Sequence, residues 1–152
     1  MKRYYPLYTL IIIAILAACA LSYSRGFSWF HYFMGFFFCQ FAMLKLFSLS
    51  GFVEGFQKYD LVAQHFRAYA FIYPFIELFL GLAYLAFIIP NVIYAITISV
   101  MGMSAVGVIK ALKAGLDVRC ACTGTVLDVP LSTVTLTEDV VMGVMALIML
   151  IS

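Results

Sequence analysis

The chain has 152 residues, of which 66% are hydrophobic, 17% aromatic and only 11% charged. Soluble domains are roughly 45–50% apolar and about 25% charged, and a folded domain of this size still exposes about a third of the surface of its unfolded chain. A water-soluble fold could not bury this much apolar surface, so the composition predicts a membrane protein. The formal net charge of +2 gives no support for nucleic-acid binding, and four cysteines are too few for a small secreted disulfide scaffold.

Five apolar stretches predict membrane-spanning helices. About 20 helical residues are needed to cross the roughly 30 Å hydrocarbon core of a bilayer. The first four stretches cover residues 4–23, 27–49, 69–89 and 92–112. The last apolar run is short, but a capping box from Thr135 to Glu138 predicts a helix from about Leu136, which gives a fifth span over residues 136–152. We therefore expect residues 1–152 to form a single all-α, polytopic membrane domain.

The first stretch also has an alternative interpretation as a cleaved signal segment. Lys2 and Arg3 precede the apolar run, and the sequence from Leu16 to Cys19 loosely fits a lipoprotein cleavage pattern. The run is long for a signal peptide, so an uncleaved helix is the expectation.

The placement of lysine and arginine predicts the orientation of the bundle. With five spans, only Arg25 lies on one side of the membrane. The basic residues on the other side are Lys2, Arg3, Lys45, Lys58, Arg67, Lys110, Lys113 and Arg119. Cytoplasmic loops carry an excess of basic residues, so the amino terminus and both charged loops are expected to be cytoplasmic, most simply in a bacterial inner membrane.

Two loops carry most of the polar residues. Residues 50–68 mix charged and aromatic side chains, with Glu54 and Lys58 four positions apart, and this pattern favours a short interfacial helix. Residues 113–137 are rich in threonine and valine and include Pro130, which predicts an irregular cap over the helix ends.

The second of these loops contains the sequence Cys120-Ala121-Cys122-Thr123-Gly124. A disulfide between cysteines one residue apart closes a small, strained ring, and strained disulfides are of the exchanging kind. The reduced pair could instead hold a soft metal such as Cu(I), Zn(II) or Hg(II). Arg119 would favour the reactive thiolate form. The remaining alternative is that both cysteines are incidental small loop residues.

The other sulfur-containing residues have simpler interpretations. Cys19 and Cys39 lie inside predicted spans, where cysteine behaves as a small hydrophobe, although facing thiols could extend a thiol path through the membrane. The methionines in the last two spans fit helix packing better than a thioether metal path; they are Met101, Met103, Met142, Met145 and Met149. His31 and His65 are isolated and fall on opposite predicted sides.

Glu77 is a carboxylate inside the third span, where an unpaired charge is costly. Lys45, near the end of the second span, is the nearest partner in predicted depth. The pair would act as a structural lock between helices, or Glu77 would have a proton or ligand role. Pro74, three residues before Glu77, removes a helix hydrogen bond and could open a polar gap there.

Several of these segments together resemble a known family. Lys45-Leu46 followed by Gly51-Phe52, and the sequence from Tyr73 to Leu82, resemble DoxX-like membrane proteins. The Cys-x-Cys-x-Gly element before the last helix looks like that of the MauE branch. The resemblance covers roughly residues 32–152 and implies a four-helix core preceded by an extra N-terminal helix. It also implies a redox accessory role in methylamine utilisation, with a thioredoxin-like partner.

Two functional hypotheses follow. In the first, Cys120 and Cys122 carry out thiol–disulfide exchange with a thioredoxin-like protein, with help from Arg119 and without a cofactor. In the second, the same two cysteines bind or transport Cu(I) or another soft metal, which a metallochaperone would deliver.

Overall fold

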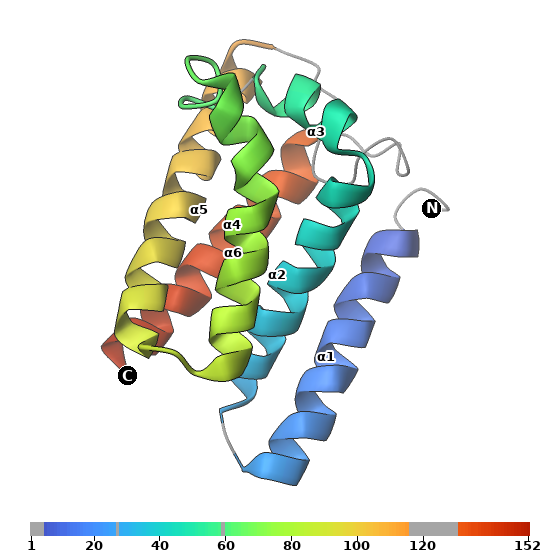
Figure 1. Cartoon of the computed structure of the whole chain (residues 1–152), viewed down its shortest axis with the longest axis vertical. Helices are drawn as coiled ribbons and strands as arrows, with labels where there is room; N and C mark the ends of the chain where they lie inside the picture. The colour runs from blue at the N-terminus through green and yellow to red at the C-terminus, as the bar shows by residue number, and fades with distance from the viewer. Residues whose placement is uncertain (1–4, 27, 59, 116–130) are drawn as a thin grey trace.

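A computed structural model of the chain describes residues 5–26, 28–58, 60–115 and 131–152. These residues form the helices α1 (Tyr5–Arg25), α2 (Trp29–Phe47), α3 (Leu49–Phe56), α4 (Arg67–Ala86), α5 (Pro90–Lys113) and α6 (Leu131–Ile151). Figure 1 shows the long helices side by side, with the short α3 at one end of the bundle. No strand occurs in this part of the chain, so the predicted all-α bundle is confirmed.

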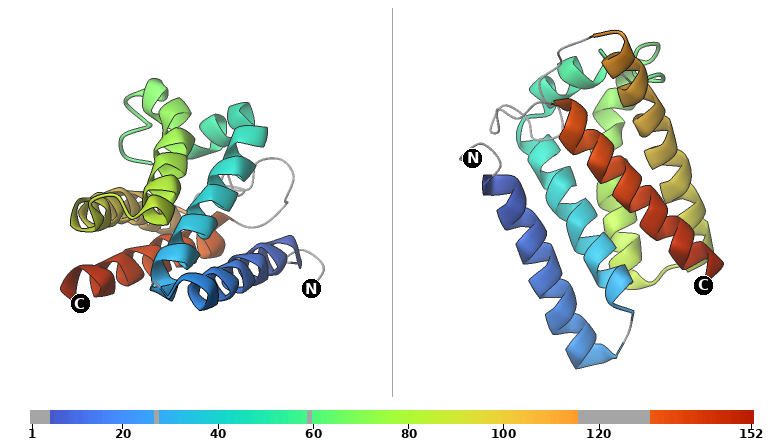
Figure 2. Two further views of the ribbon diagram at one scale, coloured as in Figure 1. Left: turned by 60° about the horizontal axis from the view of Figure 1, so that its bottom comes forward. Right: turned by 180° about the vertical axis from the view of Figure 1, so that it is seen from behind.

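The long helices associate in pairs. α2 packs along α4, α5 packs along α6, and α1 packs along the outer side of α2. Figure 2 shows α6 running obliquely across the bundle, from beside α2 at its N-terminal end toward α5 at its C-terminal end. This arrangement agrees with the expected four-helix core and additional N-terminal helix.

Among the described residues, four helical segments are long and apolar enough to cross a membrane: Leu7–Arg25, Trp29–Phe47, Arg67–Ala86 and Pro90–Lys113. α6 has 21 residues, which corresponds to about 30 Å at the usual helical rise. Large apolar side chains such as Leu16, Phe79 and Val144 are exposed on the outer faces, as expected for helices that contact lipid. The chain is therefore an integral membrane protein.

The structure corrects the expected extent of the second loop. α6 begins at Leu131 rather than near Leu136, so residues 131–137 are helical and not part of an irregular cap. The β-branched residues of this segment lower helix propensity by less than about 1 kcal/mol each. Extending an existing helix adds one backbone hydrogen bond for each residue that is fixed, and this gain overrides the weak local preference.

The first charged loop contains a short helix, as expected. The short helix α3 ends at Phe56, and turns cover residues 57–58 and 61–65. Asp60 organises these turns, because its Oδ1 accepts hydrogen bonds from the backbone N–H groups of Val62 and Ala63, each at 2.9 Å. Lys58 lies beyond the helix, so the expected four-residue spacing with Glu54 does not become a helical pair.

α2 and α4 approach each other closely at two glycines. A Cβ atom on Gly81 would lie 2.8 Å from Cys39 Sγ, 3.0 Å from the Cys39 backbone nitrogen and 3.0 Å from the Gly35 carbonyl oxygen. A Cβ atom on Gly35 would lie 3.0 Å from the Gly81 carbonyl oxygen. Small residues at such a crossing let helix backbones pack tightly where water cannot drive association.

Replacing Gly81 by alanine should therefore destabilise the bundle. The new methyl group meets backbone atoms that cannot move independently, so overpacking of about 1–3 kcal/mol should outweigh the gain of up to about 1 kcal/mol in helix propensity. Gly102→Ala is the matched control, because Gly102 is exposed on α5 with nothing within 4 Å of its added Cβ. Thermal unfolding in detergent should show a lower midpoint for Gly81→Ala only; equal shifts would contradict the close crossing.

Candidate functional site

A buried ion pair joins α2 to α4. The Lys45 Nζ atom lies 2.5 Å from both carboxylate oxygens of Glu77, and the two side chains are only 3% and 1% exposed. The partner predicted for Glu77 is thus in direct contact with it. Because each charge would be expensive alone in hydrocarbon, the pair ties the two helices together at a single relative height.

Aromatic side chains enclose this ion pair. The Lys45 ammonium lies 5.7 Å from the centroid of the Phe52 ring and 5.2 Å from that of Tyr73. Tyr73 also donates a hydrogen bond from its hydroxyl to the Glu77 carboxylate. Phe52 comes from α3, so the short helix covers the pair from the end of the bundle. These contacts replace the lost hydration of the lysine with ring faces, which attract cations.

Two further acids of α6 are buried in the same end of the bundle. Glu138 and Asp139 are 6% and 4% exposed, and Ser104 of α5 donates a hydrogen bond to Asp139. The charges of Lys45 and Glu77 lie close enough to act on Asp139. We call Lys45, Tyr73, Glu77, Ser104, Glu138 and Asp139 the polar cluster. Its three acids face a single lysine among the described residues.

The sequence interpretation missed Glu138 and Asp139 as intramembrane acids. It placed the start of the last helix near Leu136, which left Glu138 in the first turn as a capping residue. Because α6 begins at Leu131, both acids lie about two turns inside the helix. The available signal was the absence of any other charge between residues 131 and 152.

Asp60 lies in the turns beside this end of the bundle. Burial raises the pKa of its carboxyl group, while the backbone N–H groups of Ala63 and Val62 act in the opposite direction. The group therefore takes up a proton at a higher pH than an exposed aspartate does.

His31 lies at the opposite end of the bundle, in a packing role. Its Nε2 shares a hydrogen bond with the Tyr94 hydroxyl, and its ring stacks on Phe87 with the centroids 4.5 Å apart. Phe87 has a positive φ of 54° and ends α4. His65 is exposed in the turns at the other end, so the two histidines are far apart, as the sequence indicated.

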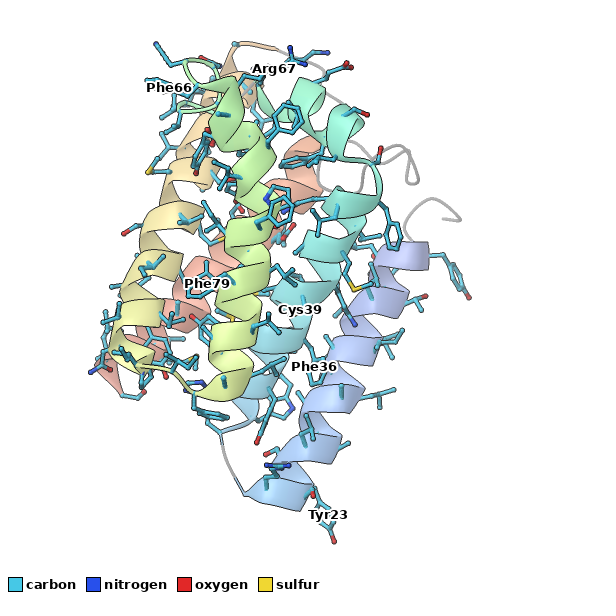
Figure 3. All side chains as sticks on the ribbon, viewed as in Figure 1. Tyr23, Phe36, Cys39, Phe66, Arg67 and Phe79 are labelled. Atoms are coloured by element: carbon cyan, nitrogen blue, oxygen red, sulfur yellow. The ribbon has the colours of Figure 1, made fainter. Side chains whose placement is uncertain are left out.

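The described cysteines and the methionines of α5 do not form a shared sulfur site. Cys19 accepts a hydrogen bond from Trp29 Nε1 at 3.3 Å, and Cys39 lies at the crossing with Gly81 (Figure 3); both thiols are free. Met101 is buried, whereas Met103 is 41% exposed, so the two thioethers do not face one site. Within the described ranges, no group of three or more histidine, cysteine or acidic residues is arranged to hold a metal ion. Arg119, Cys120 and Cys122 lie outside the described residues.

Removing one partner of the ion pair should destabilise the protein more than removing both. Lys45→Met leaves Glu77 buried without its cation, and Glu77→Gln leaves Lys45 without its anion; each should cost about 3–5 kcal/mol. The double variant Lys45→Met, Glu77→Gln has no unpaired charge in this pair and should recover part of that loss. Lys58→Met removes an exposed lysine and is the control.

The measurement is the thermal unfolding midpoint in detergent, compared as a double-mutant cycle. If the double variant lost the sum of the two single losses, the two side chains would not be coupled.

The chain was compared with known families, curated proteins and solved structures. No curated protein and no solved structure matches it significantly. Residues 10–152 match the family described as methylamine utilisation protein MauE. That match covers nearly the whole chain, including all of the polar cluster and the Cys120–Cys122 segment. The chain therefore belongs to the MauE family.

Proposed function

We propose that this protein is a thiol–disulfide redox accessory of the membrane and that Cys120 and Cys122 are its reactive pair. The observation that carries the proposal is the spacing of these two cysteines in a member of the MauE family. Cys19 is exposed on α1 and accepts a hydrogen bond from Trp29, and Cys39 lies at the crossing with Gly81; both are free thiols, so the Cys120–Cys122 pair is the candidate redox centre.

The proposed reaction is an exchange that conserves electrons and protons. A thiolate of the reduced pair attacks a disulfide of a partner protein, forming a mixed disulfide and releasing one partner thiolate. The second cysteine then attacks the mixed disulfide, which forms the Cys120–Cys122 bond and releases the partner as a dithiol. Arg119, the preceding residue, favours the thiolate that begins the reaction. The reverse direction would reduce the Cys120–Cys122 disulfide.

The bundle supplies a rigid frame for the segment that carries these cysteines. The segment connects α5 to α6, two helices that pack against each other along their length. α6 also carries two acids of the polar cluster, Glu138 and Asp139, and the hydrogen bond from Ser104 to Asp139 holds this helix to α5. A thioredoxin-like protein is the proposed partner, and methylamine utilisation is the proposed setting, both on the strength of the family.

We also propose that the end of the bundle with α3 faces the cytoplasm. Figure 3 shows Phe66 and Arg67 at this end and Tyr23 at the other. The helix directions put Lys58, Lys110 and Lys113 at the same end as Arg67, whereas Arg25 lies at the opposite end. This distribution is the one that basic residues follow around cytoplasmic loops.

A single cysteine variant should trap the partner. The variants are made in a Cys19→Ser, Cys39→Ser background. If Cys120 attacks first, Cys122→Ser should accumulate a mixed disulfide between Cys120 and the thioredoxin-like protein. If Cys122 attacks first, Cys120→Ser should accumulate the corresponding mixed disulfide with Cys122. The adduct should disappear on non-reducing gels after treatment with dithiothreitol. The double variant Cys120→Ser, Cys122→Ser should form no adduct and should lose thiol–disulfide exchange with the partner protein. Exchange at the wild-type rate in this variant would refute the proposal.

Metal analysis of the purified, reduced protein separates this proposal from soft-metal handling. The redox function predicts little bound metal and no change in metal content for Cys122→Ser. A stoichiometric soft metal that is lost in Cys122→Ser would make Cu(I) or another soft metal the cargo of the pair, since two thiolates suit such ions.

Accessibility labelling tests the orientation. In the same Cys19→Ser, Cys39→Ser background, a membrane-impermeant maleimide should label Cys120 and Cys122 only after the cells are permeabilised. The control replaces Cys120 and Cys122 and introduces Ser24→Cys, which lies beside Arg25 at the end of the bundle opposite α3. The maleimide should label this cysteine in intact cells. Labelling of the loop cysteines in intact cells would reverse the orientation.

A further inference from the structure

Asp139 is a buried acid in the polar cluster whose two carboxyl oxygens differ in their contacts. Only 4% of the residue is exposed, although it lies in a helix that contacts lipid. Ser104 of α5 donates a hydrogen bond to the carboxyl group, whereas the Oδ2 atom has no hydrogen-bond partner. A buried polar oxygen without a partner is unfavourable, so this atom indicates that the carboxyl group holds a ligand.

The neighbouring lysine does not neutralise Asp139, because another acid already binds it. Among the described residues, Lys45 is the one cation whose charge acts on Asp139. Its ammonium group lies 2.5 Å from both carboxylate oxygens of Glu77, and the rings of Phe52 and Tyr73 lie over it. An ionised Asp139 would therefore be a second buried negative charge beside one lysine, which is an expensive arrangement.

The other described groups around Asp139 carry no positive charge. Those on α4, on α6 and in the turns after α3 are acids, namely Glu77, Glu138 and Asp60. The remaining two are hydroxyl groups, those of Tyr73 on α4 and Ser104 on α5. The charge that would balance Asp139 must therefore come from a bound ligand.

We infer that Asp139 binds a proton in the folded protein at neutral pH. The proton turns the carboxylate into a neutral carboxylic acid, which costs less to bury, and the group still has an oxygen that accepts the hydrogen bond from Ser104. A proton needs neither a cavity nor a shell of ligands. A metal ion needs several ligands, and the described residues include no group of three or more acids, histidines or cysteines arranged to supply them.

The bound proton allows α6 to pack against the rest of the bundle. α6 lies along α5 and brings Asp139 near the ion pair between α2 and α4. The folded protein binds this proton where the unfolded chain does not, so its stability should fall as the pH rises and the proton is lost. This inference goes beyond the proposed redox function and does not depend on it, because it involves neither Cys120 nor Cys122.

Infrared spectroscopy of the full chain in nanodiscs tests the proton directly. A protonated carboxyl group has a carbonyl band that is separate from the carboxylate bands and shifts in heavy water. The wild-type protein should show this band at neutral pH, and Asp139→Asn should remove the contribution of one carboxyl group from it. Glu54→Gln removes an exposed acid of α3 and is the control that should leave the band unchanged.

Thermal unfolding tests the consequence for stability. Asparagine has nearly the shape of a protonated aspartate and cannot ionise, so Asp139→Asn should unfold at the wild-type midpoint at neutral pH. On going to alkaline pH, the midpoint of the wild type should fall further than that of Asp139→Asn. Lys45 is present in both proteins, so its own loss of a proton cannot produce this difference.

Three results would overturn the inference. The first is an infrared band that Asp139→Asn leaves unchanged, because Asp139 would then be ionised. The second is a loss of stability in Asp139→Asn at neutral pH as large as that in Glu77→Gln, which would make Asp139 a carboxylate bound by a cation. The third is a wild-type stability that depends on sodium and loses this dependence in Asp139→Asn, which would replace the proton by a metal ion.

A second measurement decides the point if Asp139→Asn does not fold. Wild-type protein made with isotope-labelled aspartate should show a shifted carbonyl band, because the proton then lies on an aspartate. Asp60→Asn removes the other described aspartate, and the shifted band should persist in it. A band that the label does not shift, or that disappears in Asp60→Asn, would rule out a proton on Asp139.

Discussion

The ion pair between Lys45 and Glu77 constrains the whole bundle, because neither charge is tolerable alone at that depth in hydrocarbon. The contact sets the height of α2 against α4, and the crossing at Gly35 and Gly81 brings the same two helices together further along. Phe52 of α3 then covers the lysine, which explains why a short helix is folded back onto the end of the bundle. The positions of α2, α3 and α4 thus all depend on the buried ion pair between Lys45 and Glu77.

The buried polar cluster at this end of the bundle holds more acid than base. Glu138 and Asp139 join Glu77 around Lys45, while the opposite end is organised by His31, Tyr94 and stacked aromatic rings. The polar cluster therefore lies near the end of α5 and the start of α6, which the segment with Cys120 and Cys122 connects.

Much of this architecture could be predicted from the sequence, because the bilayer imposes simple rules. Runs of about 20 apolar residues marked the long helices, and one lone acid in the third span pointed to Lys45 as its partner. Glu138 and Asp139 were missed because a capping-box pattern at Thr135 mimicked a helix start, and only tertiary structure shows the helix beginning earlier. The close approach at Gly81 depends on how helices cross, which no local pattern encodes.

The account rests most directly on Cys120 and Cys122 acting as one redox unit on a rigid membrane frame. A redox titration of the purified protein in a Cys19→Ser, Cys39→Ser background tests this, with the remaining thiols counted by alkylation and mass spectrometry across a series of dithiol and disulfide buffers. The account predicts that both thiols disappear together in a single two-electron transition. Two thiols that stay reduced throughout, or that are lost independently to buffer adducts, would contradict it.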